Sequence, residues 1–419
     1  MQQVYCPTVM SSRYIVGLDI GSLSIKAVVC EMKNDGTFAL PYATRGAVEG
    51  MRKGMVDDLS AVTRSVNAVL SDIRQIHKNA AKRIYLGIGT PNVRVQTSKG
   101  IVAVSRADFE IYKDDIARAI EAAESVKLPA NRTVIHTLTD EFAVDDIADI
   151  KDPLGMTGHR LEAKAMIIDA FAPAVKNIMR AVEVAGGGIA GLILEPIASA
   201  RAVFTRNQRE LGTCLVDVGF GTTAVAVYQE HKLLHANVLP LGAGHVTNDL
   251  AIGLKTSVEA AEGVKLAYGV ACAKDVPIRE TVDIAKYDPA TRGSVPRRYI
   301  SEIVEVRLAE ILEFINNDLK SIHKAGQLPG GIVLVGGGAK TPGFADLARQ
   351  ELRLPSRVGI PDLSGFHVPS AELSGVLEDP EYACAIGLVL WGLDKSGEGK
   401  RGNANFLGSL KKFWSYIVP

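Results

Sequence analysis

Short runs of β-branched and other apolar residues alternate with segments of helical periodicity along most of the chain. Residues 13–20 and 25–32 are typical of two strands joined by a Gly/Ser turn, and 85–90 of a third strand. Within 59–76 the apolar side chains are spaced as on one face of a helix: Leu59, Val62, Val66, Val69 and Ile73. This alternation predicts an α/β fold in which helices pack on mixed sheets.

One strand–turn–strand pattern occurs twice. Residues 15–29 (IVGLDIGSLSIKAVV) align with residues 213–227 (TCLVDVGFGTTAVAV). The matched pairs are Asp19 and Asp217, Gly21 and Gly219, Ala27 and Val225, and Val29 and Val227. The separation is too long for a solenoid repeat. It predicts two related domains, each presenting one hairpin turn to a shared cleft.

The region from about 92 to 170 departs from this regular alternation of strand and helix patterns. It contains a strand pattern at 94–104, a helical pattern at 113–126 and further strand patterns at 133–147 and 161–170. We expect a small inserted α+β module here. The alternative is an elaborated part of the first domain.

Composition narrows the functional classes. With 419 residues, 47% of them hydrophobic, the chain is long enough for two or more domains. The 47 Lys and Arg residues balance 47 Asp and Glu residues, so no excess charge favours nucleic acid as a partner. Five scattered cysteines without a C-x-x-C pair favour a reducing compartment and no zinc site. The sequence has no unbroken run of about 18 apolar residues, so we expect no membrane span. Residues 1–12 resemble a loose extension more than a signal peptide.

The two Asp-containing turns suggest phosphate chemistry. Glycines let a backbone approach a phosphate closely, and successive N–H groups in a turn can bind it. Asp19 and Asp217 are suited to hydrated Mg²⁺, which prefers oxygen ligands, and Lys26 could neutralise phosphate charge. A turn of this kind also occurs in ordinary hairpins that bind no ligand. The two turns together are therefore stronger evidence for a phosphate site than either turn alone.

A third glycine cluster, Gly336, Gly337 and Gly338, ends a predicted strand before a helix expected near Pro342. Such a turn could accommodate a purine and ribose. It lacks the G-x-G-x-x-G spacing of a dinucleotide site, which disfavours a nicotinamide enzyme. Glu262 and Lys265 could reach an adenosine, although their spacing alone favours an exposed i,i+3 ion pair.

The C-terminal segment has the pattern of an amphipathic helix. Apolar residues at 410, 413, 414 and 417 share one helix face, and residues 394–408 have the composition of a flexible tether. Aromatic residues beside lysines suit the headgroup region of an anionic membrane. The predicted membrane contacts are Leu410, Lys411, Lys412, Phe413, Trp414 and Ile417. The alternative is a helix docked on the protein's own surface.

The order of these features, with the helix EPIASA at 195–200 between the hairpins, resembles the actin, sugar-kinase and heat-shock chaperone ATPase superfamily over residues 13–393. Adding the insertion and the tail, the chain resembles the bacterial cell-division family FtsA. The resemblance implies an α/β actin-like two-domain ATPase fold with a duplicated ribonuclease H-like core and an inserted α+β subdomain, 1C.

The resemblance also implies a domain order. The expected parts are a disordered extension (1–12), subdomain 1A (13–91 and 171–205), subdomain 1C (92–170), subdomain 2A (206–257 and 331–380), subdomain 2B (258–330), a return helix to 1A (381–393), a flexible linker (394–408) and a membrane-targeting helix (409–419).

By the same resemblance, the protein binds ATP and Mg²⁺, polymerises, and tethers the tubulin-like ring protein FtsZ to the inner membrane. Implied partners are further copies in an actin-like filament, the C-terminal peptide of FtsZ at the second domain, other divisome proteins at subdomain 1C, and an anionic membrane surface. The implied location is peripheral, on the cytoplasmic face of the inner membrane at the division site.

Site roles follow from the matching motif positions. The implied phosphate and adenosine ligands are Gly21, Ser22, Lys26, Gly219, Gly221, Thr222, Thr223, Glu262, Lys265, Gly336, Gly337 and Gly338. Asp19 and Asp217 would serve Mg²⁺ through water, and Glu195 could orient a water for hydrolysis. Leu23 and Phe220 depart from the family pattern in the two turns, so ATP binding is a firmer prediction than hydrolysis, and at most a weak ATPase is expected.

Two alternatives stay open. A small-molecule kinase of this superfamily needs an aspartate base, for which Asp140 in the insertion is the nearest candidate. A pilus-assembly adaptor would share the type of insertion but is not expected to end in this tail.

Overall fold

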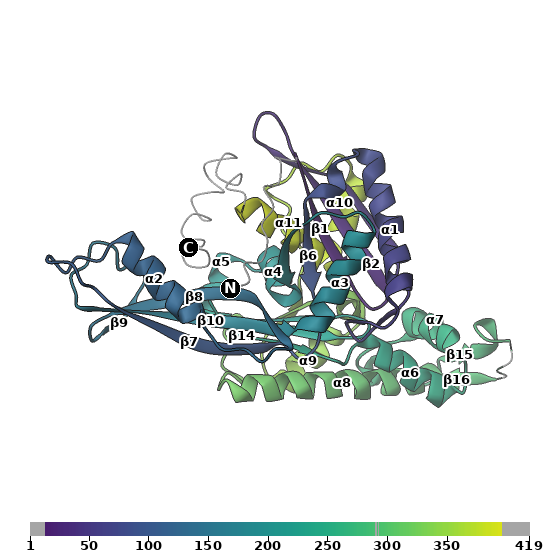
Figure 1. Cartoon of the computed structure of the whole chain (residues 1–419). Helices are drawn as coiled ribbons and strands as arrows, with labels where there is room; N and C mark the ends of the chain where they lie inside the picture. Colours follow the sequence, from purple (N-terminus) through teal and green to yellow (C-terminus); the bar gives the residue numbers. More distant parts are fainter. Residues whose placement is uncertain (1–12, 290, 292, 396–419) are drawn as a thin grey trace.

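The computed structural model describes residues 13–289, 291 and 293–395. Two five-stranded mixed sheets form the centres of two lobes (Figure 1). The first sheet has the order β11 (Ile189–Leu194), β6 (Ile84–Ile88), β1 (Tyr14–Ile20), β2 (Ser24–Met32) and β3 (Phe38–Ala47). The second has the order β14 (Lys232–Leu239), β13 (Thr223–Gln229), β12 (Thr213–Val218), β17 (Ile332–Val335) and β18 (Ser356–Val358). In both, the central strand pairs antiparallel with the next strand and parallel with a later one, so the predicted duplication is confirmed.

Helices cover the sheets and join the lobes. Those of the first lobe and the junction are α1 (Leu59–Ile76), α3 (Ala172–Val184), α4 (Glu195–Val203), α5 (Arg206–Leu211), α10 (Ala371–Leu377) and α11 (Ala383–Lys395). Those of the second lobe are α6 (Ala243–Leu254), α7 (Val258–Tyr268), α8 (Arg297–Ser321) and α9 (Phe344–Leu352). The bounds of α1 match the periodicity of 59–76, and Asp58 caps this helix by accepting the N–H groups of Ser60 and Ala61. The helix expected near Pro342 begins instead at Phe344, after a 3₁₀ turn at Gly337–Lys340.

One hydrophobic core reaches both sheets, and a second core covers the other face of the second sheet. Val16 and Leu86 of the first sheet belong to the same buried cluster as Leu215 and Val333 of the second, with α4 and α11 between them. The two helices lie so close that a Cβ added to Gly387 would meet the carbonyl oxygen of Ala198 at 1.8 Å. The helix pair therefore fixes how the two lobes meet.

Four antiparallel strands and one helix form the inserted module, which projects to one side of the lobes (Figure 1). Its sheet has the order β7 (Arg94–Ala103), β10 (Arg160–Phe171), β8 (Arg132–Val144) and β9 (Ile147–Ile150), and α2 (Lys113–Glu124) packs on it. At Gly100 a Cβ would meet the Ala119 carbonyl of α2 at 2.1 Å, so glycine permits the close approach. The predicted α+β insertion is confirmed.

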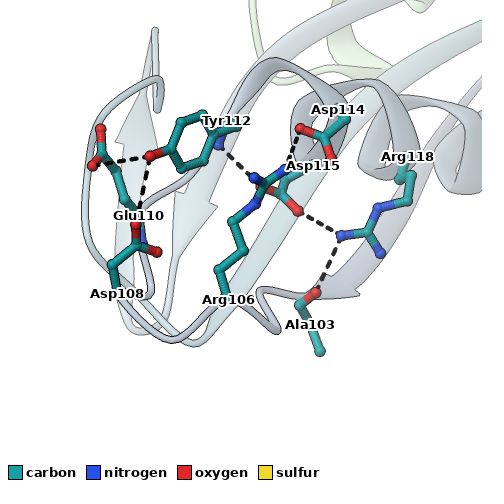
Figure 2. A network of polar contacts seen from close by, with 8 residues as sticks. All are labelled: Ala103, Arg106, Asp108, Glu110, Tyr112, Asp114, Asp115 and Arg118. Atoms are coloured by element: carbon teal, nitrogen blue, oxygen red, sulfur yellow. Dashed lines mark hydrogen bonds and ion pairs between the residues drawn. The ribbon is translucent and has the colours of Figure 1, made fainter.

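The helix of the insertion is held at its start by a polar network (Figure 2). The backbone N–H of Tyr112 donates to Asp115 Oδ2 at 3.0 Å, and Arg118 donates to the other oxygen at 2.5 Å. Arg106 donates to Asp114 and lies 4.2 Å from the centre of the Tyr112 ring. The backbone hydrogen bond from Tyr112 is the main cause that lowers the pKa of Asp115. The loop before α2 is therefore ordered by charge-assisted contacts.

A carboxylate joins the insertion to the second lobe. Glu141 on β8 accepts from Lys164 of β10 and from Lys232 of β14, both at 2.8 Å. These side chains line a cavity of about 450 Å³ between the insertion and the edge of the second sheet. The two lysine hydrogen bonds lower the pKa of Glu141 to about 2. An ion pair therefore ties the module to the second lobe.

Two small hairpins complete the described chain, β4 (Met51–Arg52) with β5 (Met55–Val56) and β15 (Thr281–Asp283) with β16 (Ser294–Pro296). Within the part of the chain that the structure describes, no helix is both long enough and apolar enough to cross a bilayer. The predicted extension 1–12, linker residues 396–408 and tail 409–419 lie outside the described residues. So do the predicted membrane contacts Leu410, Lys411, Lys412, Phe413, Trp414 and Ile417.

We expect Glu141→Gln to loosen the contact between the insertion and the second lobe. The change leaves two lysines facing a neutral amide, and we expect a loss of about 1–2 kcal/mol in the free energy of unfolding. Hydrogen exchange should rise in β14. Because the folded pKa is depressed, the contribution of the wild-type carboxylate is present above pH 4.5 and is lost as the pH falls towards 2.

Glu162→Gln is the matched control, because Glu162 pairs within the insertion, with Lys99 at 2.7 Å. It should leave exchange in β14 unchanged. Equal exchange in β14 for the wild type and Glu141→Gln would show that the bridge does not hold the two parts together.

Candidate functional site

The two aligned hairpins close in the same way. In the first, the N–H of Gly21 donates to the Ser24 carbonyl at 3.1 Å, and in the second the N–H of Gly219 donates to the Thr222 carbonyl at 2.9 Å. Asp19 lies opposite Lys26 in its ladder, whereas Asp217 lies opposite an alanine. The lysine is therefore particular to the first hairpin.

The hairpin turns of the two lobes meet. Ser22 Oγ, in the first turn, accepts the N–H of Gly54 at 3.0 Å. A Cβ on Gly221, in the second turn, would lie 2.5 Å from the same oxygen, and a Cβ on Gly54 would lie 3.1 Å from the Thr222 methyl group. The structure thus brings the two predicted hairpin turns into contact.

Acidic side chains gather behind these turns around one lysine. Asp19 is 6% exposed and lies 3.3 Å from the Lys26 ammonium. Ser199 of α4 donates to Asp217 Oδ2 at 2.9 Å. Burial and the charge of Asp19 raise the pKa of Asp217 to about 6, although the Ser199 bond opposes this. Burial alone would lower the pKa of Lys26, but Asp19, Glu381 and Asp217 together raise it above its ordinary value.

Glu195 begins α4 and lies against the end of β6. A Cβ on Gly89 would be 2.0 Å from Glu195 Oε2, so only glycine leaves room for this carboxyl group. Burial, followed by the charges of Asp19 and Asp217, raises the pKa of Glu195 well above its usual range, and Lys26 partly offsets the effect. Asp19, Asp217 and Glu195 thus surround the largely buried Lys26 ammonium group, and an added cation would favour the ionised form of these carboxyl groups.

This donor set fits a hydrated divalent ion. In the described parts of the chain, no three His, Cys, Asp or Glu side chains are placed to hold a metal ion directly. Thr90 and Thr223 are fully buried, and their hydroxyl oxygens have no hydrogen-bond partner among the described residues. Carboxylates that reach an ion through water, with hydroxyl groups nearby, are typical of Mg²⁺ sites that also involve phosphates.

The Glu262 and Lys265 pair lies close to the second hairpin. Lys265 donates to Glu262 at 2.6 Å and to the Thr247 hydroxyl at 2.9 Å. The ion pair that the spacing predicted is present. Only 10% of the Lys265 side chain is exposed, so the prediction that the pair is exposed is wrong for the lysine. Its ammonium lies 5.6 Å from the centre of the Phe220 ring. A Cβ on Gly244 would touch that ring at 2.8 Å, so the bulk of Phe220 is accommodated by the start of α6.

The third glycine cluster lies beside Asp217. Gly336 has φ of 81°, and its N–H donates to the Pro380 carbonyl at 3.0 Å. A Cβ there would meet Asp217 Oδ1 at 2.4 Å. Gly337 faces Glu381, and a Cβ on Gly338 would meet the Val218 side chain at 2.4 Å. All three glycine segments predicted from the sequence therefore converge on the two aspartates.

Sequence reasoning missed several members of the site. Ser199 lies four residues after Glu195 in the helix, and this spacing could have placed both on one face. Glu381 approaches Lys26 from the 3₁₀ turn Pro380–Tyr382, just before α11, and no local pattern marks it. Gly89 and Thr90 follow a buried strand, a common place for functional residues in α/β folds.

Two duplicated lobes with facing Asp-containing hairpins define the class of actin-like ATPase folds. Solved structures of this class align with the chain. They include a PilM–PilN type IV pilus biogenesis complex (TM-score 0.62, 19% identity, covering 90% of this chain and 98% of that one). MreB5 of Spiroplasma citri bound to ADP aligns with a TM-score of 0.54 at 12% identity, covering 93% of this chain and 98% of that one.

Sequence relatives define the family more narrowly. Cell division protein FtsA of Pseudomonas aeruginosa is 33% identical over 392 residues, covering 94% of this chain and 92% of the relative. The Escherichia coli K12 protein of the same name is 30% identical over 418 residues, covering 97% of each. Family models for cell division protein FtsA and for the SHS2 domain inserted in FtsA match residues 214–387 and 91–169. The chain belongs to the FtsA family of cell-division proteins, which confirms the resemblance seen in the sequence.

We expect Gly336→Ala to destabilise the second lobe and displace Asp217. The added methyl group meets a carboxylate and a backbone carbonyl, and φ of 81° is unfavourable for alanine. The free energy of unfolding in urea should fall by about 1–3 kcal/mol. Gly375→Ala in α10 is the control, because a Cβ there meets nothing within 4 Å. It should be neutral or stabilising by up to about 1 kcal/mol, and equal losses in both variants would contradict the crowding at Gly336.

Proposed function

We propose that the protein binds Mg-ATP between its two lobes, polymerises as an actin homologue, and tethers the FtsZ ring to the cytoplasmic face of the inner membrane during division. The observation that carries the nucleotide proposal is the pair of facing hairpins, whose aspartates lie around a single buried lysine. Membership of the FtsA family supports the division role.

We propose the following roles, which the convergence of the two hairpins and the third glycine cluster supports. Gly21 and Gly219 would let the backbone approach the phosphates closely, and Ser22, Gly221, Thr222 and Thr223 would offer N–H or hydroxyl groups to them. Lys26 would balance their charge, and Asp19 and Asp217 would orient the water around Mg²⁺. When bound, Mg²⁺ would neutralise phosphate charge. Glu262, Lys265 and Gly336 to Gly338 would contact the adenosine.

We propose that hydrolysis is slow and that nucleotide binding dominates. Glu195 would orient a water, but burial, followed by the charges of Asp19 and Asp217, raises its pKa and so disfavours the carboxylate form that acts as a base. A protonated carboxyl group cannot accept a proton from water. Leu23 is 44% exposed in the first turn, where bulk would crowd the terminal phosphate.

The proposed partners follow the proposed subdomains. The FtsZ C-terminal peptide is expected within 258–330, where Leu266 and Val306 expose 75% and 71% of their surface. Other divisome proteins are expected at the insertion, here called subdomain 1C. Self-association into a filament would use the surfaces of both lobes.

Membrane attachment is proposed from the tail sequence. Four large apolar side chains contribute about 1.5–3 kcal/mol each on burial, while ordering about ten residues costs a comparable amount. Lys411 and Lys412 add about 1 kcal/mol apiece near anionic lipid. One tail alone therefore attaches weakly, and a polymer carrying many tails would attach firmly.

We expect the affinity for Mg-ATP to fall as the pH drops below about 6. Asp217 has a pKa near 6 and must lose its proton to favour a cation, so the loss is at most about tenfold per pH unit. Asp217→Asn should bind at least about tenfold more weakly at pH 8. The ratio of wild-type to variant affinity, titrated calorimetrically from pH 5 to 8, cancels the titration of the nucleotide itself. A ratio that does not change with pH would remove Asp217 from the site.

We expect Trp414→Glu to abolish co-sedimentation with anionic liposomes, because a charge replaces the largest apolar side chain of the tail. Ser415→Glu, on the predicted polar face, adds the same charge and should retain most of the binding. Full retention by Trp414→Glu would refute the anchor. Binding that is no weaker after removal of residues 405–419 would favour the pilus-type adaptor, and acceptor-dependent ATP turnover would favour a kinase.

A further inference from the structure

Helix α4 begins without a capping side chain of its own. Its N-cap residue, Leu194, has an apolar side chain and makes no side-chain cap hydrogen bond. Pro196, the second residue of the helix, has no N–H to anchor. Helix starts that lack a cap are free to shift or fray. Glu195 is the first residue of this helix, so its position depends on other contacts.

One of these contacts comes from the inserted module. The Nε2 atom of His136, on β8, accepts the N–H of Leu194 at 3.0 Å. His136 is 7% exposed and Leu194 is fully buried, so water does not compete for this bond. Leu194 ends β11, the edge strand of the first sheet, and the imidazole caps that edge where the strand turns into α4.

The ring is held in the state that this bond requires. Because Nε2 accepts, the proton of the neutral imidazole is on Nδ1. Burial is the main cause that lowers the pKa of His136 to about 3, with the nearby Lys395 adding to it, so the ring stays neutral at physiological pH. Trp391 of α11 lies behind it, with ring centres 5.6 Å apart.

Glu195 is thus enclosed from two sides. On one side, Gly87 and Gly89 of the β6 end leave space for its side chain and nothing larger. On the other, the N–H of the preceding residue, Leu194, is held by an imidazole of the inserted module, 58 residues earlier in the chain than Leu194. A shift of β8 would move this peptide group directly.

We propose that His136 is a positioning residue through which the inserted module sets the placement of Glu195 at the proposed nucleotide site. The role of Glu195 at the nucleotide site rests on the proposed function. The hydrogen bond by which His136 holds the start of α4 does not depend on it. A single hydrogen bond, from the Leu194 N–H to His136, links the insertion directly to the start of α4.

The test separates hydrogen bonding from packing. His136→Gln retains an acceptor oxygen near the position of Nε2, whereas His136→Leu fills similar space without one. Leu138→Ala is the control for packing alone, because Leu138 is buried two residues further along the same strand. All variants are made in the full chain, and their melting temperatures are measured.

We expect His136→Leu to raise amide exchange at least tenfold in peptides covering residues 192–200, with His136→Gln within threefold of wild type. Where ATP turnover is measurable, kcat should fall at least tenfold in His136→Leu while KM changes less than twofold. Leu138→Ala should lower the melting temperature without either effect.

Wild-type exchange at residues 192–200 in His136→Leu would overturn the proposal, as would equal effects in the Gln and Leu variants. If the wild type fails to bind Mg-ATP, the proposed function fails, but the exchange measurement still decides the placement of the helix start. If turnover is undetectable, exchange alone decides.

Discussion

The structure depends on holding like charges close together. Asp19 and Asp217 approach from separate lobes, with Glu195 beside them and Lys26 as the buried cation among them. Burial is the main cause that raises the pKa values of Asp217 and Glu195, and the neighbouring carboxylates raise them further. Such an arrangement costs free energy and persists only because the surrounding fold enforces it. Groups with shifted pKa values of this kind are common at functional sites. A cation bound between the carboxylates would relieve the repulsion.

The helix pair α4 and α11 supplies the opposing stabilisation. Both are packed in the core that the two sheets share, and Ser199 of α4 reaches Asp217 across the junction. At the far end of the pair, Arg201 lies 3.3 Å from Asp394, near the last described residue of the chain. One rigid unit therefore runs from the acidic centre to the point where the proposed tether begins. Changes at either end act on the same packed helices.

The inserted module is built into this frame. His136 binds the start of α4 in the first lobe, and Glu141, five residues later on the same strand, binds Lys232 of the second lobe. Two polar contacts on one strand thus reach both halves of the molecule. A displacement of β8 would therefore act on both lobes without direct contact with the proposed nucleotide site.

Patterns among neighbouring residues in the sequence were sufficient to predict the duplicated lobes and several residues of the candidate site. The repeated strand–Asp–turn–strand segment identified the duplicated lobes, and helical spacing identified α1, because both signals come from near neighbours along the chain. The glycine segments and the two aspartates were recognised for the same reason. Only the tertiary structure decided the rest: the bond from Ser199, the approach of Glu381, the largely buried Lys265 and the imidazole of His136 at α4. These contacts join residues on different elements, some 58 or 91 positions apart, and depend on how whole sheets pack. Residue spacing carries no record of such packing.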